Sequence, residues 1–196
     1  YADWWNHGKR GDPAWESYYL DVVVPALLAR YPIRPERRYH AVVGISMGGL
    51  TDIWLALHAS SRLDRLALCN TAGTIGGAES WNARISAVHT SGIASISHAL
   101  LEIWFGERYL HEHPHDVARY RAVLEKCSVD GYASCCAAIR DYDARPELAA
   151  IRVPTLVIAG THDVSTPPVD AHFIADHVPG ARYVELDAAH ISNVER

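Results

Sequence analysis

The pattern G-x-S-x-G at residues 44–48 constrains the fold of this chain most strongly, because of the segments on either side of it. Residues 41–45 form a short apolar run with β-branched side chains, which is typical of a strand buried on both faces of a parallel sheet. Residues 50–59 fit a helix. Between a strand and a helix, the pattern predicts a sharp turn whose two glycines avoid collisions with neighbouring backbone. Such a turn holds the Ser46 hydroxyl clear of the sheet, as a candidate nucleophile.

Further apolar runs predict three more strands, over residues 66–69, 154–159 and 183–186. A helix is expected at 169–177, between the last two of these strands. Another helix is expected from Pro13 to about Tyr31, with proline in its first turn. The alternation of strands and helices predicts an α/β fold with a parallel sheet and right-handed crossovers.

The interval from residue 74 to residue 146 breaks this alternation, because it contains helical patterns and no clear strand. A wholly helical insertion between two strands predicts a lid over the carboxyl ends of the strands, where open α/β sheets bind ligands. The expected organisation is a first part of the core with the serine turn (1–73), a helical lid (74–146) and a second part of the core (147–196). Within the lid, helices are expected at 81–88, 93–104, 117–125 and 132–142.

A serine hydroxyl is a weak nucleophile unless a base takes its proton. His190 directly follows the last predicted strand, and Asp163 lies in the loop after the third. The order serine, acid, histidine, each at the end of a strand, is that of the α/β-hydrolases, which this chain resembles. His190 is therefore the candidate general base and Asp163 the candidate orienting acid. The Met47 N–H, at the start of the helix after Ser46, is the expected oxyanion donor.

The chain holds twelve histidines, so residue type alone does not identify the base. The position of each histidine and aspartate relative to the predicted strands decides which of them is a catalytic candidate. The run at 111–115 (His-Glu-His-Pro-His) could bind a metal, but its proline and the absence of helical spacing favour a polar loop. His162 has less positional support as the base. Asp163 is preferred to Asp170 and Asp187, since it occupies the loop directly after a strand. We expect no metal.

Charge, apolar runs and cysteine spacing limit the partners that the chain can bind and the cell compartment in which it is expected. A formal net charge of −5 argues against nucleic acid and anionic membranes as partners. No apolar run approaches the ~20 residues that span a bilayer, and residues 1–5 lack the pattern of a signal peptide. The four cysteines show no metal-binding spacing, so reduced thiols in a cytoplasmic protein are expected.

From Ser46 onward the chain resembles the 3-oxoadipate enol-lactonases, bacterial α/β-hydrolases of the β-ketoadipate pathway of aromatic breakdown. The resemblance covers about three quarters of the chain and is most specific in the G-Y-x-x-C-C-A-A-I-R-D stretch of the expected lid. It implies hydrolysis of 3-oxoadipate enol-lactone to 3-oxoadipate without a cofactor, and it assigns the nucleophile, acid and base to Ser46, Asp163 and His190. The matching stretches are 68–72, 81–85, 131–141, 153–161 and 186–195.

Such a substrate carries a carboxylate, so its pocket needs a cation or several donors. Arg84 and Arg140 of the expected lid are candidates, because arginine binds carboxylates in a bidentate way. Either could equally be a surface residue. Trp81 and Trp104 are candidates for lining the pocket, with packing inside the lid as the alternative.

The first forty or so residues resemble instead the esterase and mycolyltransferase branch of the same fold. The strands that normally precede the serine turn, with their second oxyanion donor, and the helix after the catalytic histidine are not expected in this chain. Two alternatives to the lactonase therefore stay open: a broader carboxylesterase or acyltransferase, and a truncated, inactive scaffold. The expected partner is a small lactone or ester, and association into a homo-oligomer through an exposed edge strand stays open as well.

Overall fold

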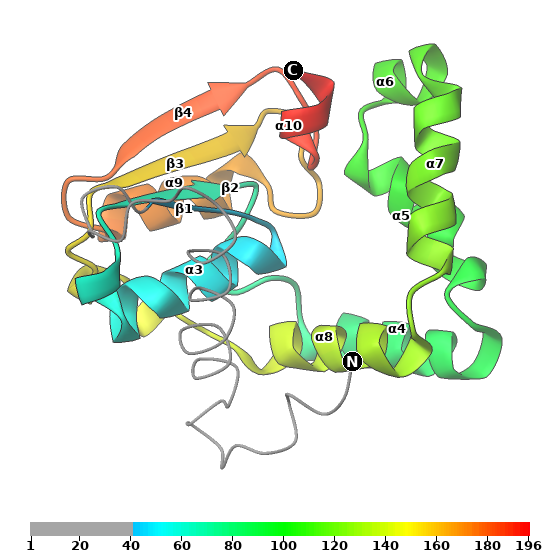
Figure 1. Cartoon of the computed structure of the whole chain (residues 1–196), viewed down its shortest axis with the longest axis horizontal. Coiled ribbons are helices and arrows are strands. Elements are labelled where there is room, and N and C mark those ends of the chain that lie inside the picture. The colour runs from blue at the N-terminus through cyan, green and yellow to red at the C-terminus, as the bar shows by residue number, and fades with distance from the viewer. Residues whose placement is uncertain (1–40) are drawn as a thin grey trace, which may run out of the picture. The chain divides into compact units, whose positions relative to one another are not determined.

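The computed structural model describes residues 41–196 (Figure 1). The chain divides into two units, Tyr1–Tyr39 and His40–Arg196, and the described residues all belong to the second. The helix expected at 13–31 and the N-terminal resemblance to esterases and mycolyltransferases lie outside the described residues.

A parallel four-stranded sheet forms the core of the described part, in the order β1-β2-β3-β4. Its register pairs Gly44 with Leu68 and Leu68 with Val157. Because the strands are parallel and in chain order, all four carboxyl ends meet at one edge of the sheet. The predicted α/β fold and parallel sheet are thus confirmed. The strands are β1 (Ala41–Ile45), β2 (Arg65–Cys69), β3 (Thr155–Gly160) and β4 (Arg182–Leu186).

Two helices and a 3-10 helix cover one face of this sheet. Helix α3 (Met47–His58) packs on β1 and β2, and α9 (Pro168–His177) packs on β3 and β4. The 3-10 helix η4 (Arg145–Ala150) contacts both helices, so the three share a face. A shorter 3-10 turn, η3 (Ser60–Arg62), follows α3.

Helix α3 begins three residues before its expected start at Leu50. Glycines are poor helix formers, which hid the first turn in the sequence. Packing explains why one of them is needed there: a Cβ on Gly49 would lie 2.5 Å from Cγ2 of Thr71, the residue that follows β2 by two positions. The expected tight turn at 46–49 is therefore reduced to Ser46 alone.

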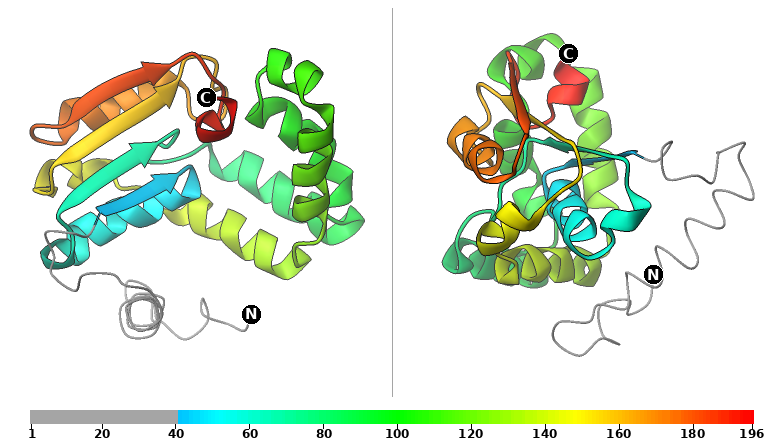
Figure 2. Two further views of the ribbon diagram at one scale, coloured as in Figure 1. Left: turned by 45° about the horizontal axis from the view of Figure 1, so that its top comes forward. Right: turned by 90° about the vertical axis from the view of Figure 1, so that its left-hand side faces the viewer.

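Five helices lie between β2 and β3 in sequence, and Figures 1 and 2 show them beyond the arrowheads of the strands. One buried apolar cluster, which includes Leu50 of α3, Trp81 and Ile139, joins them to the core. A second, around Val88, Leu100 and Leu124, lies among the helices themselves. The helices are α4 (Ala78–Ser91), α5 (Ala94–Trp104), α6 (Glu107–Glu112), α7 (Pro114–Glu125) and α8 (Val129–Asp141).

The polar loop expected at residues 111–115 was wrong. Helix α6 runs to Glu112, and α7 begins at Pro114, so His113 alone lies between two helices. A proline is well accommodated in the first helical turn, because its missing N–H would have no helical partner there. No helix within residues 41–196 combines the length and the apolar character that a membrane span requires.

Candidate active site

Ser46 stands on a strained turn between β1 and α3. Its φ of 54° lies in the left-handed region, which few non-glycine residues adopt. Its N–H donates to the carbonyls of Cys69 (3.1 Å) and Asn70 (3.0 Å). A Cβ on Gly44 would lie 2.3 Å from the carbonyl carbon of Gly48, so the chain crosses itself too closely for any side chain there. Strain of this kind persists only where the surroundings enforce it, and it marks functional sites.

The start of α3 provides backbone donors beside Ser46. Met47 is the first helical residue, so its N–H has no partner within the helix. The carbonyl of Ser46 accepts hydrogen bonds from the Leu50 N–H (3.3 Å) and the Thr71 hydroxyl (2.7 Å), which fix the turn on the helix. The helix dipole favours negative charge at this end.

Asp163 and His190 form a buried hydrogen-bonded pair at the ends of β3 and β4. The distance from His190 Nδ1 to Asp163 Oδ2 is 2.8 Å, and the two residues are only 2% and 3% exposed. The carboxylate also accepts hydrogen bonds from the N–H groups of Ser165 (2.8 Å) and Thr166 (3.0 Å), from the Thr166 hydroxyl (2.8 Å) and from Asn70 Nδ2 (3.0 Å). Asp163 is thereby held by its own loop and by Asn70, the residue directly after β2.

These donors keep Asp163 ionised in spite of its burial. Burial alone would raise the pKa of Asp163, but the hydrogen bond and charge of His190, with the other donors, hold it below its usual value. An ionised Asp163 requires a proton on His190 Nδ1, which leaves Nε2 of a neutral imidazole free to accept a proton. The pair therefore has the arrangement that a general base needs.

Within residues 41–196 no hydrogen bond joins the Ser46 hydroxyl to His190. Catalytic hydrogen bonds are often long until the reacting complex forms. The structure thus brings Asp163 and His190 into contact and places Ser46 at the same edge of the sheet.

The loop that carries His190 is also bonded to the helical segment. The Glu195 carboxylate accepts from the Ala189 N–H (2.9 Å) through Oε2 and from the Gly106 N–H (2.8 Å), between α5 and α6, through Oε1. The Ile191 N–H donates to the carbonyl of Trp104 (3.1 Å). Glu195 belongs to a short helix, α10 (Ser192–Glu195), which lies directly after the His190 loop, where no helix was expected. The His190 loop therefore has fixed contacts with the helices beyond the sheet.

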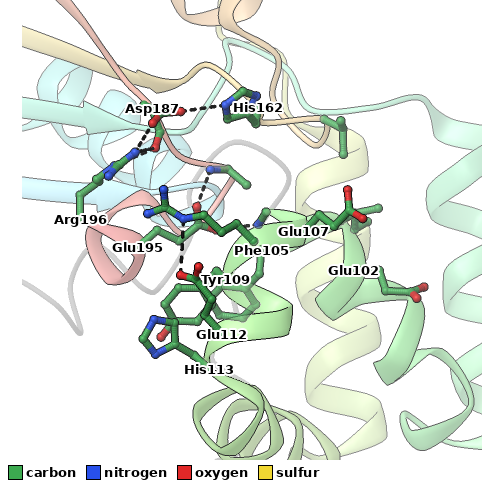
Figure 3. A pocket seen from close by; sticks show the side chains of 15 residues that line it. Glu102, Phe105, Glu107, Tyr109, Glu112, His113, His162, Asp187, Glu195 and Arg196 are labelled. Atoms are coloured by element: carbon green, nitrogen blue, oxygen red, sulfur yellow. Dashed lines mark hydrogen bonds and ion pairs between the residues drawn. The ribbon is translucent and has the colours of Figure 1, made fainter.

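Beside this junction lies a cavity of about 490 Å³, which Figure 3 shows from close by. Its walls come from α5 and α6 on one side and from the loops after β3 and β4 on the other. Charged side chains dominate it, among them the exposed pair of His162 and Asp187 (2.9 Å) and Arg196, which also bonds Asp187. His162 is thus paired with Asp187, whereas Asp163 is paired with His190.

The four predicted substrate-binding residues all lie in or at the end of the helices between β2 and β3. Trp81 is buried and donates from Nε1 to the Ile75 carbonyl (2.6 Å). The Arg84 guanidinium lies over the Trp81 ring, 4.7 Å from its centroid. Arg140 bonds both oxygens of Asp141 and, at 2.6 Å, Asn82 Oδ1. The fourth, Trp104, is half-buried at the end of α5.

Sequence reasoning missed three residues that organise the site: Asn70, Thr166 and Glu195. Asn70 directly follows β2 and could have been found by the same rule that found Asp163, since both are polar residues at the end of a strand. Thr166 lies three residues after Asp163, and an aspartate side chain commonly accepts from backbone N–H groups two or three residues ahead. Glu195 has no local signal, because its partners are a separate helix and the His190 loop. No cluster of three metal-ligating side chains exists in the part of the chain that the structure describes.

Comparison with known proteins adds to this geometry. A model of the alpha/beta hydrolase fold matches residues 2–196. The chain belongs to the alpha/beta hydrolase fold family. The predicted resemblance within that family is also confirmed: 3-oxoadipate enol-lactonase 2 of Acinetobacter baylyi is 40% identical over 153 residues, which are 78% of this chain and 57% of that protein. 3-Oxoadipate enol-lactonase 1 of the same organism is 34% identical over 78% of this chain and 58% of its own length.

Solved structures of the alpha/beta hydrolase fold agree with the sequence matches. The enol-lactonase from Burkholderia xenovorans superimposes with a TM-score of 0.81 at 43% identity, over 89% of this chain and 65% of that one. A hydrolase from Pseudomonas aeruginosa gives a TM-score of 0.79 at 40% identity, over 89% and 64%. This chain spans less than two thirds of the length of each of these relatives.

Proposed function

We propose that this chain is a serine hydrolase that opens 3-oxoadipate enol-lactone to 3-oxoadipate by acyl transfer, without a cofactor. The observation that carries the proposal is the buried pair of His190 and Asp163 at the same sheet edge as the strained Ser46. Similarity to two enol-lactonases supports the choice of substrate. The reaction would place the chain in bacterial catabolism of aromatic compounds.

In the first half of the proposed reaction, Ser46 Oγ attacks the lactone carbonyl while His190 Nε2 takes the hydroxyl proton. Asp163 holds the Nδ1 proton and stabilises the imidazolium that forms. The Met47 N–H donates to the oxyanion of the tetrahedral intermediate. Collapse of the intermediate breaks the ring C–O bond and leaves an acyl ester on Ser46, and the released enolate oxygen takes the proton from His190.

In the second half, His190 removes a proton from water as the water oxygen attacks the acyl carbonyl. The Ser46–acyl bond then breaks, and His190 returns the proton to Ser46 Oγ. The product is a free carboxylic acid whose enol converts to the ketone. Each half therefore uses the same base and the same oxyanion donor.

The carboxylate of the substrate needs a partner in the pocket, and Arg84 is the stronger of the two candidates. Arg140 is already bonded to both oxygens of Asp141, whereas Arg84 pairs with no carboxylate among residues 41–196. The Arg84 guanidinium stacks on Trp81 and bonds the Tyr132 hydroxyl, and its five N–H groups leave donors for an incoming carboxylate. We propose the two tryptophans, Trp81 and Trp104, as apolar walls of the same substrate pocket, although neither they nor the two arginines line the cavity of Figure 3.

A cytoplasmic location is part of the proposal. The cysteines are all free thiols in the structure, and one of them, Cys127, is exposed. Thiols persist in reducing compartments.

Hydrolysis of 3-oxoadipate enol-lactone and of p-nitrophenyl acetate by the wild-type chain and by Ser46→Ala tests the function. We expect the lactone to be preferred and Ser46→Ala to retain only background activity. The matched control is Ser91→Ala, at an exposed position at the end of α4. Preference for the simple ester would replace the lactonase with a general esterase. Absence of turnover, together with no covalent labelling of Ser46 by a fluorophosphonate, would reduce the chain to an inactive scaffold.

A further inference from the structure

We propose that Asn70, directly after the carboxyl end of β2, is a positioning residue that aligns the turn of Ser46, the acid Asp163 and the base His190. The inference rests on the proposed function, because it gives Asn70 a part in the same reaction. Asn70 is completely buried. Its φ of 44° makes it, with Ser46, one of two non-glycine residues in the left-handed region within residues 41–196.

The backbone of Asn70 connects the turn of Ser46 to β3 in the middle of the sheet. Its N–H donates to the carbonyl of Ile158 in β3 (2.8 Å), and its own carbonyl accepts from the N–H of Ser46 (3.0 Å). The left-handed conformation turns the chain away from the strand direction directly after β2. A shift of the Asn70 backbone would therefore also move Ser46, because the hydrogen bond from the Ser46 N–H joins the two residues directly.

The side chain of Asn70 connects the acid to the loop of the base. Its Nδ2 donates to Asp163 Oδ2 (3.0 Å) and to the carbonyl of Ala189 (3.1 Å), while its Oδ1 accepts from the Ser192 hydroxyl (2.5 Å). Both amide protons and the amide oxygen are thus used. The orientation of the amide follows from its partners, because a flipped amide would set its oxygen against a carboxylate and a carbonyl.

These contacts constrain both ends of the hydrogen bond between Asp163 and His190. The oxygen that receives Asn70 Nδ2 is the same Oδ2 that accepts the Nδ1 proton of His190 at 2.8 Å. The second amide proton holds the carbonyl of Ala189, the residue immediately before His190. Asparagine supplies two diverging N–H donors and tolerates a positive φ, a combination that few other residues offer.

The competing interpretation is that the buried Asn70 amide, with all its hydrogen bonds made, only stabilises the fold. Two substitutions separate the two readings, because aspartate and glycine also tolerate the left-handed region. Asn70→Asp keeps the shape but replaces Nδ2 with an oxygen, which then faces both Asp163 Oδ2 and the Ala189 carbonyl. Asn70→Gly keeps the backbone and removes every side-chain contact. Ser97→Ala is the matched control, since Ser97 is a fully buried hydrogen-bonding residue of α5 that bonds Glu125, outside the site.

The experiment measures, for each variant, cooperative thermal unfolding, the low-field proton NMR signal of His190 Nδ1, and kcat and KM for p-nitrophenyl acetate. For both Asn70 variants we expect kcat to fall about 10- to 100-fold while KM stays within about threefold, since a donor to a charged group is lost. The Nδ1 signal should move or disappear in both variants. It should be unchanged in Ser97→Ala, whatever that variant loses in stability.

An unchanged Nδ1 signal and kcat in folded Asn70→Gly would overturn the proposal, and that variant decides the question if Asn70→Asp does not fold. The NMR signal is observable whether or not the chain hydrolyses an ester. A wild-type chain with the signal but without turnover or labelling of Ser46 would contradict the proposed function alone. The two failures are therefore distinguishable.

Discussion

His190 Nδ1 lies 2.8 Å from Asp163 Oδ2, and the pair is almost completely withdrawn from solvent. Burial makes both groups depend on their hydrogen bonds, because an unpaired charge or polar atom in the interior is costly. Residues 41–196 also contain an exposed aspartate–histidine pair of similar length, Asp187 with His162 at 2.9 Å, whose side chains are 70% and 64% exposed. Both pairs join a histidine ring nitrogen to an aspartate carboxylate, but one is buried and the other is exposed to solvent. The exposed pair is therefore an internal control for the buried one.

Asp163→Asn should reduce kcat by roughly 10²- to 10⁴-fold, because the amide can donate to Nδ1 and so favours the wrong imidazole tautomer. Steady-state hydrolysis of p-nitrophenyl acetate measures the loss. Asp187→Asn is the matched control and should change kcat less than about threefold, since exposed pairs contribute little. Equal losses in both variants would contradict the assignment of Asp163 as the orienting acid.

Glu195→Gln should loosen the contact between the His190 loop and the start of α6. Glutamine retains one acceptor oxygen and faces the other N–H with a donor, so one of the bonds to Ala189 and Gly106 is lost. Hydrogen exchange of these two amides should become about 10-fold faster or more, as expected for a lost bond to a carboxylate. Glu107→Gln, at an exposed position in the first turn of α6, is the control. Unchanged exchange in Glu195→Gln would show that other contacts hold the loop.

The proximity of Asp163 and His190 could be predicted from sequence, because parallel strands in chain order bring all residues after their carboxyl ends to one edge of the sheet. The contacts of Asn70 with Ala189 could not, since they join positions 119 residues apart and depend on how two loops fold over that edge. The same limit applied to Glu195. The sequence pattern also failed to predict the first turn of α3, which contains two glycines. It did not predict helix α6, which is only six residues long.

Gly160→Ala should destabilise the chain and displace the His190 loop. A Cβ at Gly160 would lie 2.4 Å from the carbonyl oxygen of Ala189 and 2.5 Å from that of Ala188, and backbone atoms cannot yield as a flexible side chain can. We expect the free energy of unfolding to fall by about 1–3 kcal/mol, with a matching loss of kcat. Gly77→Ala should change the free energy of unfolding by less than about 1 kcal/mol: a Cβ there meets nothing within 4 Å, and the poorer N-cap of α4 is offset by a less flexible unfolded chain. Urea titration of both variants measures the difference.

Asp52 should make the stability of the chain fall as pH rises towards neutrality. It is a buried residue of α3 whose Oδ2 has no hydrogen-bond partner in the described part of the chain, and burial raises its pKa from 3.8 to about 7. Between these values the folded state binds more protons than the unfolded state, so the free energy of unfolding decreases with pH. Above pH 7 both states are ionised, and the whole penalty is present.

Asp52→Asn removes this ionisation and should therefore stabilise the chain at pH 8. The expected gain is roughly 1–4 kcal/mol, at about 1.4 kcal/mol for each unit of pKa shift, and it should shrink towards zero as the pH approaches 4. Urea unfolding at pH 4.5 and pH 8 gives both values. Asp176→Asn, at an exposed position in α9, should change the free energy of unfolding by less than about 0.5 kcal/mol at either pH. A gain in Asp52→Asn that does not depend on pH would mean that the amide improves packing and that the carboxyl of Asp52 is not the source of the penalty.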